Sequence, residues 1–215
     1  DPFLSGKMSV ASTGGIKDGG AWGTIKHFAL NGQESHRFKI DAVCSERAIR
    51  EIYLKSFEMA VKEKTVMSIM TSYNPINGHW AASNYDLCTT ILRKEWGYKG
   101  FVMTDWWAKM NDVVTGGKES NQDTRDMVRA QNDLYMVVNN NGAAINAAGD
   151  DTVEALEAGK LTVGELQRCA KNICRFLLGT PVMKRPLKDF DPLLTVTAKE
   201  AVNTDGKQVC ALQSG

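Results

Sequence analysis

The stretch Gly100–Met110, GFVMTDWWAKM, starts as an apolar strand and ends in a polar and aromatic turn. Its run of Phe, Val and Met is typical of a strand that is buried on both faces. The run stops at Asp105, and two tryptophans follow directly. A carboxylate followed by two indoles does not belong in a protein core.

Three other stretches have the same mostly apolar character, and they are Gly23–Phe28, Val66–Tyr73 and Asp133–Val137. Helical patterns separate the four predicted strands. The predicted fold class is therefore α/β, with about four parallel strands alternating with helices. Four such units form either an open doubly wound sheet or part of a (β/α) barrel. We expect this domain over residues 1–179 and a tail or linker over 180–215, with one strand at Leu194–Thr197.

Each predicted helix has a recognisable start or end. Ser45 and Asn84 are predicted N-caps, Thr162 and Glu165 form a capping box, and Gly159 follows the helix in DDTVEALEAG. A further helix is expected from about residue 121 to 129. The expected buried stripes are Ile49, Ile52, Tyr53, Phe57 and Ala60; Leu87, Cys88, Ile91 and Leu92; and Leu166, Cys169, Ala170, Ile173 and Leu177.

Composition limits the possible functions. The net charge of +1 gives no reason to expect a nucleic acid partner, and no stretch reaches the ~18 apolar residues of a membrane span. The three histidines lack the spacing of zinc ligands and no phosphate-binding motif is present, so we expect no metal and no cofactor. Five cysteines without a CxxC pair favour core thiols and a cytoplasmic location.

Polar groups gather at the carboxyl ends of the predicted strands, where the active face of a parallel α/β fold lies. The ends carry Lys26 and His27, then Tyr73, then Asp105 and Trp106. Each has a structural alternative. Asp105 could cap a helix, Lys26 could be an ordinary exposed residue, and His27, Tyr73 and Trp106 could be satisfied core residues. Together they suit a sugar, because hydroxyls need polar partners and indoles pack against the apolar face of a pyranose ring.

Several segments are similar, in the same order, to those of glycoside hydrolase family 3, the β-glucosidase and β-xylosidase family. They are DPFLSGKM, KHFALNGQESHR, SERAIREIYLKSFEMAVKE, the long block from Val66 to Trp106, DLYM, and VEALEAGKLTVGELQRCAKNICRFL. The resemblance covers residues 1–178. It implies the second half of a (β/α)8 barrel.

The resemblance also implies roles for the site residues. Asp105 would be the nucleophile of a retaining mechanism, and a β-glucoside or oligosaccharide would be the substrate. Lys26 and His27 would hold hydroxyls of the non-reducing sugar. Met70 and Tyr73 would line the pocket beside the nucleophile, and Trp106 would pack near the sugar.

The sequence departs from the family pattern at several points. A complete family barrel has more chain before DPFLSG, and the acid/base residue is usually a Glu of a separate domain, which no segment here resembles. We therefore expect the rest of the barrel and an acid/base domain as partners. Trp107 and Gln131 stand where the family often has Gly.

Three alternatives stay open. The chain could be a folded but inactive half-barrel that self-associates, for example as a homodimer, because sheet edges left open favour association. It could belong to the β-N-acetylglucosaminidase branch, to which the Glu34–His36 stretch has a faint similarity. Glu34 with Arg37 fits the glucosidase pattern better. A sugar-binding module would not call for the nucleophile block.

Overall fold

The computed structural model describes residues 1–136 and 145–184. Its centre is a four-stranded parallel sheet in the order β1-β2-β5-β8. The strands are β1 (Thr24–Phe28), β2 (Ser68–Thr71), β5 (Phe101–Trp106) and β8 (Leu134–Met136). All four predicted strands are present within two residues of their expected starts. The predicted fold class, parallel strands alternating with helices, is confirmed.

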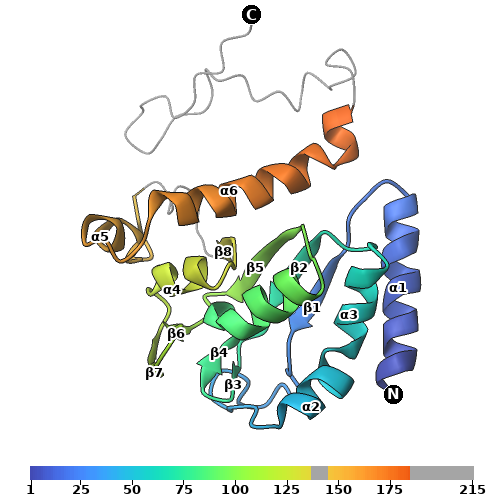
Figure 1. Ribbon diagram of the computed structural model, residues 1–215, viewed down its shortest axis with the longest axis horizontal. Helices are drawn as coiled ribbons and strands as arrows, with labels where there is room; N and C mark the ends of the chain where they lie inside the picture. The colour runs from blue at the N-terminus through green and yellow to red at the C-terminus, as the bar shows by residue number, and fades with distance from the viewer. Residues whose placement is uncertain (137–144, 185–215) are drawn as a thin grey trace, which may run out of the picture.

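The helices lie around this sheet (Figure 1). They are α1 (Pro2–Asp18), α2 (Glu46–Ala48), η1 (Ile49–Tyr53), α3 (Lys55–Lys62), η2 (Ala81–Ser83), η3 (Asp86–Glu95), α4 (Thr124–Arg129), α5 (Thr152–Glu157), α6 (Val163–Leu178) and η4 (Pro181–Lys184). α1 packs along α3, and α6 contacts β5. The first residues of the expected tail form η4, while the expected strand at Leu194–Thr197 lies outside the described residues.

The predicted helix caps form as expected. The Ser45 side chain accepts a hydrogen bond from the Ala48 amide, and Asn84 Oδ1 accepts one from the Leu87 amide at 2.9 Å. Thr162 and Glu165 make both hydrogen bonds of the capping box. These short-range signals are legible in the sequence because each involves residues three positions apart.

One predicted apolar stripe is wrong in part. Ile49 and Ala60 are buried, but Ile52 and Tyr53 are exposed. The cause is the π-helical segment η1, in which the Leu54 amide donates to the Ile49 carbonyl five residues back. A turn with an extra residue rotates the side chains away from the 3.6-residue period, and Leu54 takes the core position instead.

The stripe of α6 is also shifted. Cys169 is buried as expected, but Ala170 and Leu177 are exposed and the polar Asn172 is buried. Asn172 faces inward because its Nδ2 donates to Asp133 Oδ1 at 2.9 Å. By contrast, all four residues of the predicted η3 stripe are buried.

Two hairpins follow the sheet strands and were absent from the sequence prediction. β3 (Pro75–Ile76) pairs with β4 (His79–Trp80) after β2, and β6 (Met110–Asp112) pairs with β7 (Gly116–Ser120) after β5. The first turn is made by Asn77 and Gly78, both with positive φ. Asn-Gly is a strong hairpin signal that the sequence does contain.

Two apolar clusters fill the interior. One joins β1, β2 and β5 to η1, α3 and η3, and its fully buried members include Phe28, Leu54, Ile69, Leu92 and Val102. The other lies towards α4, α5 and α6 and includes Tyr73, Ala108 and Met110. The second cluster comes up to the carboxyl end of β5, so it supports the residues around Asp105.

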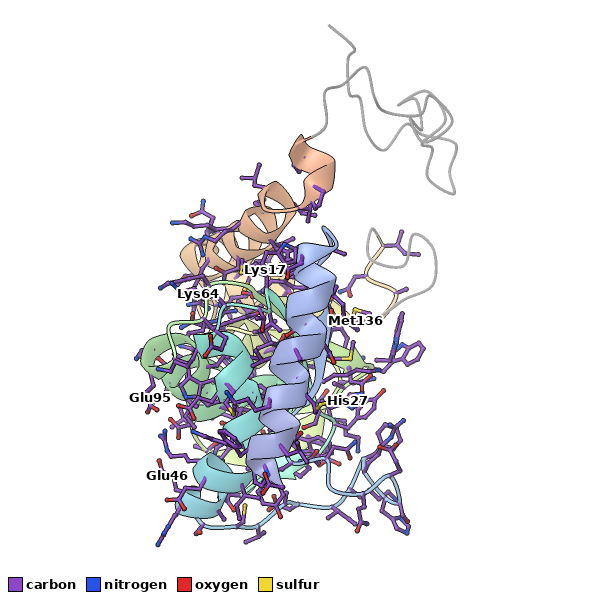
Figure 2. All side chains as sticks on the ribbon, turned by 90° about the vertical axis from the view of Figure 1, so that its right-hand side faces the viewer. Lys17, His27, Glu46, Lys64, Glu95 and Met136 are labelled. Carbon is purple, nitrogen blue, oxygen red and sulfur yellow. The ribbon has the colours of Figure 1, made fainter. Side chains whose placement is uncertain are left out.

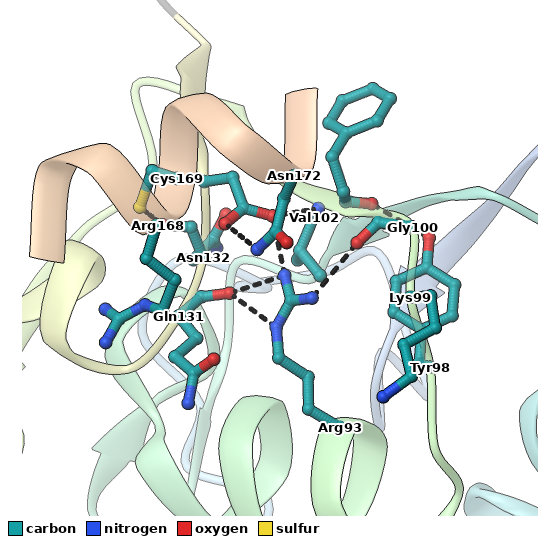
Figure 3. A network of polar contacts seen from close by, with 12 residues as sticks. Arg93, Tyr98, Lys99, Gly100, Val102, Gln131, Asn132, Arg168, Cys169 and Asn172 are labelled. Carbon is teal, nitrogen blue, oxygen red and sulfur yellow. Dashed lines mark hydrogen bonds and ion pairs between the residues drawn. The ribbon is translucent and has the colours of Figure 1, made fainter. Parts of the chain in front are cut away.

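A buried polar network fixes the opposite, amino-terminal end of β5 (Figure 3). Asp133 Oδ2 accepts hydrogen bonds from Arg93 Nη2 at 2.6 Å and from the Val102 amide at 2.9 Å. Arg93 also donates to the carbonyls of Gly100 and Gln131. Burial raises the pKa of Asp133, and the charge of Arg93 acts in the opposite direction.

Candidate active site

Asp105 lies at the carboxyl end of β5 with its carboxylate held on both oxygens. Oδ1 accepts the Trp106 amide at 2.8 Å, and Oδ2 lies 3.3 Å from His27 Nε2. The residue is buried, with 5% of its surface exposed. The alternative that Asp105 caps a helix is wrong, because a turn and then β6 follow β5. Asp105 therefore lies where the active face of a parallel α/β fold is expected, at the carboxyl end of a strand.

His27 lies near the carboxyl end of β1, which β2 separates from β5 in the sheet. Burial lowers the pKa of His27, more than the nearby Asp105 raises it. A neutral ring carries one proton, and we assign it to Nε2 because a carboxylate oxygen can only accept a hydrogen bond. The pair thus presents a fixed carboxylate and an oriented imidazole at the same edge of the sheet, on the two strands that flank β2. Figure 2 shows His27 and Met136 on one flank of the molecule and Glu46 and Glu95 on the other.

Tyr73 follows β2 and is buried beside the same carboxylate. Burial, and after it the negative charge of Asp105, raise the pKa of Tyr73 to about 12. The hydroxyl therefore keeps its proton at neutral pH and can donate a hydrogen bond near Asp105.

The loop after β1 adds two residues that our residue assignment did not include. The Phe38 ring lies 4.4 Å from the Tyr73 ring, and the Arg37 guanidinium lies 4.9 Å from it. Arg37 also forms an ion pair with Glu34 at 2.7 Å. The opposite charges of Glu34 and Arg37, three positions apart, indicate an ion pair within this loop. The contact of the loop with Tyr73 is evident only from the fold.

The remaining predicted site residues lie on the same strands. Lys26 is exposed and adjoins His27, and Met70 is half-buried in β2, in register with Met103 of β5. Trp106 ends β5 and is 45% exposed. The structure thus places Asp105, His27 and Tyr73 in one group, with Lys26, Met70 and Trp106 adjoining it.

A cavity of the described residues lies elsewhere. Its volume is about 800 Å³, and it is lined by residues such as Glu46, Arg50, His79, Arg129 and Arg168. None of the predicted site residues lines it. Asp105 instead lies near the carboxyl end of β5, outside this cavity. Among the described residues, no group of three or more His, Cys, Asp or Glu side chains could hold a metal ion.

Comparison with known proteins decides the family. Residues 1–176 match the model of the glycosyl hydrolase family 3 N terminal domain. The chain belongs to glycosyl hydrolase family 3. A family 3 relative, a beta-glucosidase of Ruminococcus albus, is 48% identical over 205 residues, which is 95% of this chain and 21% of that protein.

Solved structures agree with this assignment to family 3. A beta-glucosidase from Paenibacillus barengoltzii superposes with a TM-score of 0.84 and 69% identity, over 86% of this chain and 20% of that one. Beta-glucosidase 3B from Thermotoga neapolitana, solved in complex with glucose, gives 0.72 and 38%, over 86% and 24%. The chain therefore spans about a fifth of the length of the relatives it matches.

Trp107 and Gln131, which stand where the family often has glycine, both have a backbone conformation that favours glycine. Trp107 has φ +50° and Gln131 has φ +67°. Both are left-handed conformations that glycine adopts readily and that other residues adopt at a cost. Gln131 is engaged through its carbonyl, which accepts two hydrogen bonds from Arg93.

Proposed function

We propose that this chain carries the nucleophile of a retaining β-glycosidase that hydrolyses terminal non-reducing β-D-glucosyl residues. The observation that carries the proposal is the fixed Asp105 carboxylate at a strand end, beside the half-buried His27 and the protonated Tyr73. Family membership and the beta-glucosidase relatives support it.

The chemistry follows from these positions. An Asp105 oxygen attacks the anomeric carbon, the bond to the leaving-group oxygen breaks, and a covalent glycosyl-enzyme forms. Water then attacks the same carbon and releases Asp105 as the carboxylate. Lys26 donates to a sugar hydroxyl, and the unprotonated His27 Nδ1 accepts a hydrogen bond from one. Met70 lines the pocket, and the Trp106 indole packs against the apolar face of the ring.

The second carboxyl group is assigned to the rest of the parent enzyme. A retaining mechanism needs two carboxyl groups about 5–5.5 Å apart, one of which acts as acid and then as base. We expect that group from the acid/base domain, and the outer wall of the pocket from the remainder of the barrel. A substrate with a good leaving group needs little acid assistance, so it tests Asp105 alone.

The test is the intact mass of the chain after incubation with 2,4-dinitrophenyl 2-deoxy-2-fluoro-β-D-glucopyranoside. The expected result is the mass gain of one fluoroglucosyl group, mapped by peptide digestion to Asp105 and lost in Asp105→Asn. The matched control is Asp18→Asn, since Asp18 is an exposed carboxylate at the end of α1, before β1 begins. A chain that is folded by circular dichroism and gains no mass would contradict the proposal.

A second candidate is self-association of an inactive half-barrel. Within the described residues, β1 pairs only with β2 and β8 only with β5, so each leaves one edge unpaired. Unpaired edges are templates for another chain. Sedimentation analysis distinguishes the two candidates when it is run on the same sample as the mass measurement. A monomer that gains the adduct refutes this second candidate, and a dimer without the adduct supports it.

A further inference from the structure

Trp107 has a backbone conformation that its side chain does not favour. Its φ of +50° lies in the left-handed region, which bulky residues rarely adopt. Burial of the indole does not offset this, because Trp107 is 57% exposed and is more exposed than Trp106. An indole kept in a strained and open position suggests a role at the surface.

The backbone around Trp107 is firmly anchored. Its amide donates to the Met136 carbonyl at 2.9 Å, and the next residue, Ala108, is fully buried. The Ala108 amide donates to the Asp105 carbonyl at 3.3 Å, and the Tyr135 hydroxyl donates to the Ala108 carbonyl at 3.1 Å. The exposed indole therefore stands on a rigid turn, and a ligand that stacks on it does not have to order the backbone first.

Trp106 and Trp107 form a pair beside the nucleophile. Their ring centroids lie 5.5 Å apart and the ring planes are tilted by 40°. Trp107 is only two residues from Asp105, so its Cα lies within about 7 Å of the Asp105 Cα. The backbone of both tryptophans is therefore close to a sugar bonded at Asp105. In the proposed function the Trp106 indole packs against that sugar. The Trp107 indole then remains available to contact the leaving group.

We propose that Trp107 recognises the leaving group of the substrate by stacking on a ring that this group carries. The ring is either aromatic or a second pyranose, because both present an apolar face to an indole. This proposal rests on the proposed function, since it assumes that the glucosyl group lies at Asp105. It adds a residue that determines leaving-group specificity.

Binding of glycosides with a sulfur link, which resist hydrolysis, tests this without any need for turnover. The ligands are phenyl, methyl and β-D-glucopyranosyl 1-thio-β-D-glucopyranosides, and dissociation constants come from ligand-observed NMR titration. We expect the phenyl or the disaccharide ligand to bind about tenfold tighter than the methyl ligand, since stacking of a base on an aromatic residue has this magnitude. Whichever ligand shows the gain identifies the kind of ring.

Two variants give the decisive comparison. Trp107→Gly suits the left-handed backbone and is expected to fold, to lose the tenfold preference and to bind the methyl ligand as before. Trp107→Phe is expected to keep part of the preference. Equal binding of all three ligands, no binding of any, or a preference that survives in Trp107→Gly would overturn the inference.

The failure of this inference differs from the failure of the proposed function. A ring preference that depends on Trp107, in a chain that gains no fluoroglucosyl adduct, supports the indole platform and refutes the nucleophile. An adduct at Asp105 without any ring preference supports the nucleophile and refutes the role of Trp107.

Discussion

His27 is the residue whose ionisation most directly affects the candidate site. Its pKa in the folded protein lies below the ordinary value of 6.5, chiefly because of burial, although Asp105 opposes the shift. As the pH falls below 6.5, the unfolded chain binds a proton at this position before the folded chain does. The folded state therefore loses stability as the pH falls through the folded pKa, and it has the full contribution above pH 6.5.

The lowered pKa of His27 predicts that the stability of the wild type depends on pH differently from that of His27→Asn. The wild-type free energy of unfolding should fall relative to that of the variant as the pH decreases below about 6.5. Urea denaturation at several pH values measures it. In Asp105→Asn the attractive charge is gone, so an NMR titration should give a still lower pKa for His27. Parallel stability curves for the wild type and His27→Asn would refute the assignment.

Trp107 provides a second prediction at the scale of one residue. Because its φ is positive, Trp107→Gly should be more stable than Trp107→Ala, by roughly 0.5–1 kcal/mol after the greater backbone freedom of Gly is included. Trp106, in the strand β5, is the control. There the order should reverse, with Trp106→Ala the more stable variant. Thermal unfolding of the four variants gives the order of stability of the Gly and Ala variants at each position. The same order at both positions would mean that the positive φ of Trp107 is not the cause.

The start of β5 depends on a glycine for a reason of packing. A Cβ on Gly100 would overlap the carbonyl oxygen of Met67, which accepts the Phe101 amide at 3.1 Å. This close approach of two backbones sets the register between β2 and β5. The register in turn places Tyr73 and Asp105 at the same edge.

Gly100→Ala is therefore expected to destabilise the fold by roughly 1–3 kcal/mol, as overpacking of a core does. The control is Gly164→Ala in α6, where the nearest atom to an added Cβ is 3.9 Å away. That change should be neutral or stabilising by up to about 1 kcal/mol, because Ala favours helix. Chemical denaturation measures the free energy of unfolding of both variants. Equal changes in Gly100→Ala and Gly164→Ala would show that crowding at Gly100 does not destabilise the fold.

At the scale of the whole molecule, the Arg93–Asp133 pair links distant parts of the chain. It joins η3, the start of β5, the turn before β8 and, through Asn172, the helix α6. The Arg93 side chain is 8% exposed and that of Asp133 is fully buried. A buried pair of this kind is stabilising only as long as both charges are present.

Arg93→Met should therefore destabilise the protein by about 3–5 kcal/mol, because it leaves a buried carboxylate without its counter-charge. Arg47→Met is the matched control. Arg47 pairs with Glu51 at 3.1 Å, but its side chain is 83% exposed, so the loss should be below about 1 kcal/mol. Urea midpoints distinguish the two variants. A small effect at Arg93 would mean that the network does not hold these elements together.

Local signals in the sequence were sufficient for most of the elements. The strands, the caps of Ser45, Asn84 and Thr162 and the glycine after α5 follow from residues close in the chain, and the structure contains them. The helix α1 was not predicted, although Asp1 caps it and Pro2 begins it. Its sequence is rich in small residues and lacks a clear apolar stripe, so its packing against α3 stabilises it.

The candidate site divides in the same way. Residues close in the chain are enough to predict that polar groups follow the parallel strands, because strand ends can be read from the chain and parallel strands end at one edge. Three contacts depend on the tertiary fold: the His27 ring lies 3.3 Å from Asp105, Phe38 and Arg37 cover Tyr73, and Asn172 faces Asp133. Such contacts join residues tens of positions apart, and the packing of whole elements fixes them. The same holds for the π-helical turn at η1, which no pattern of period 3.6 contains.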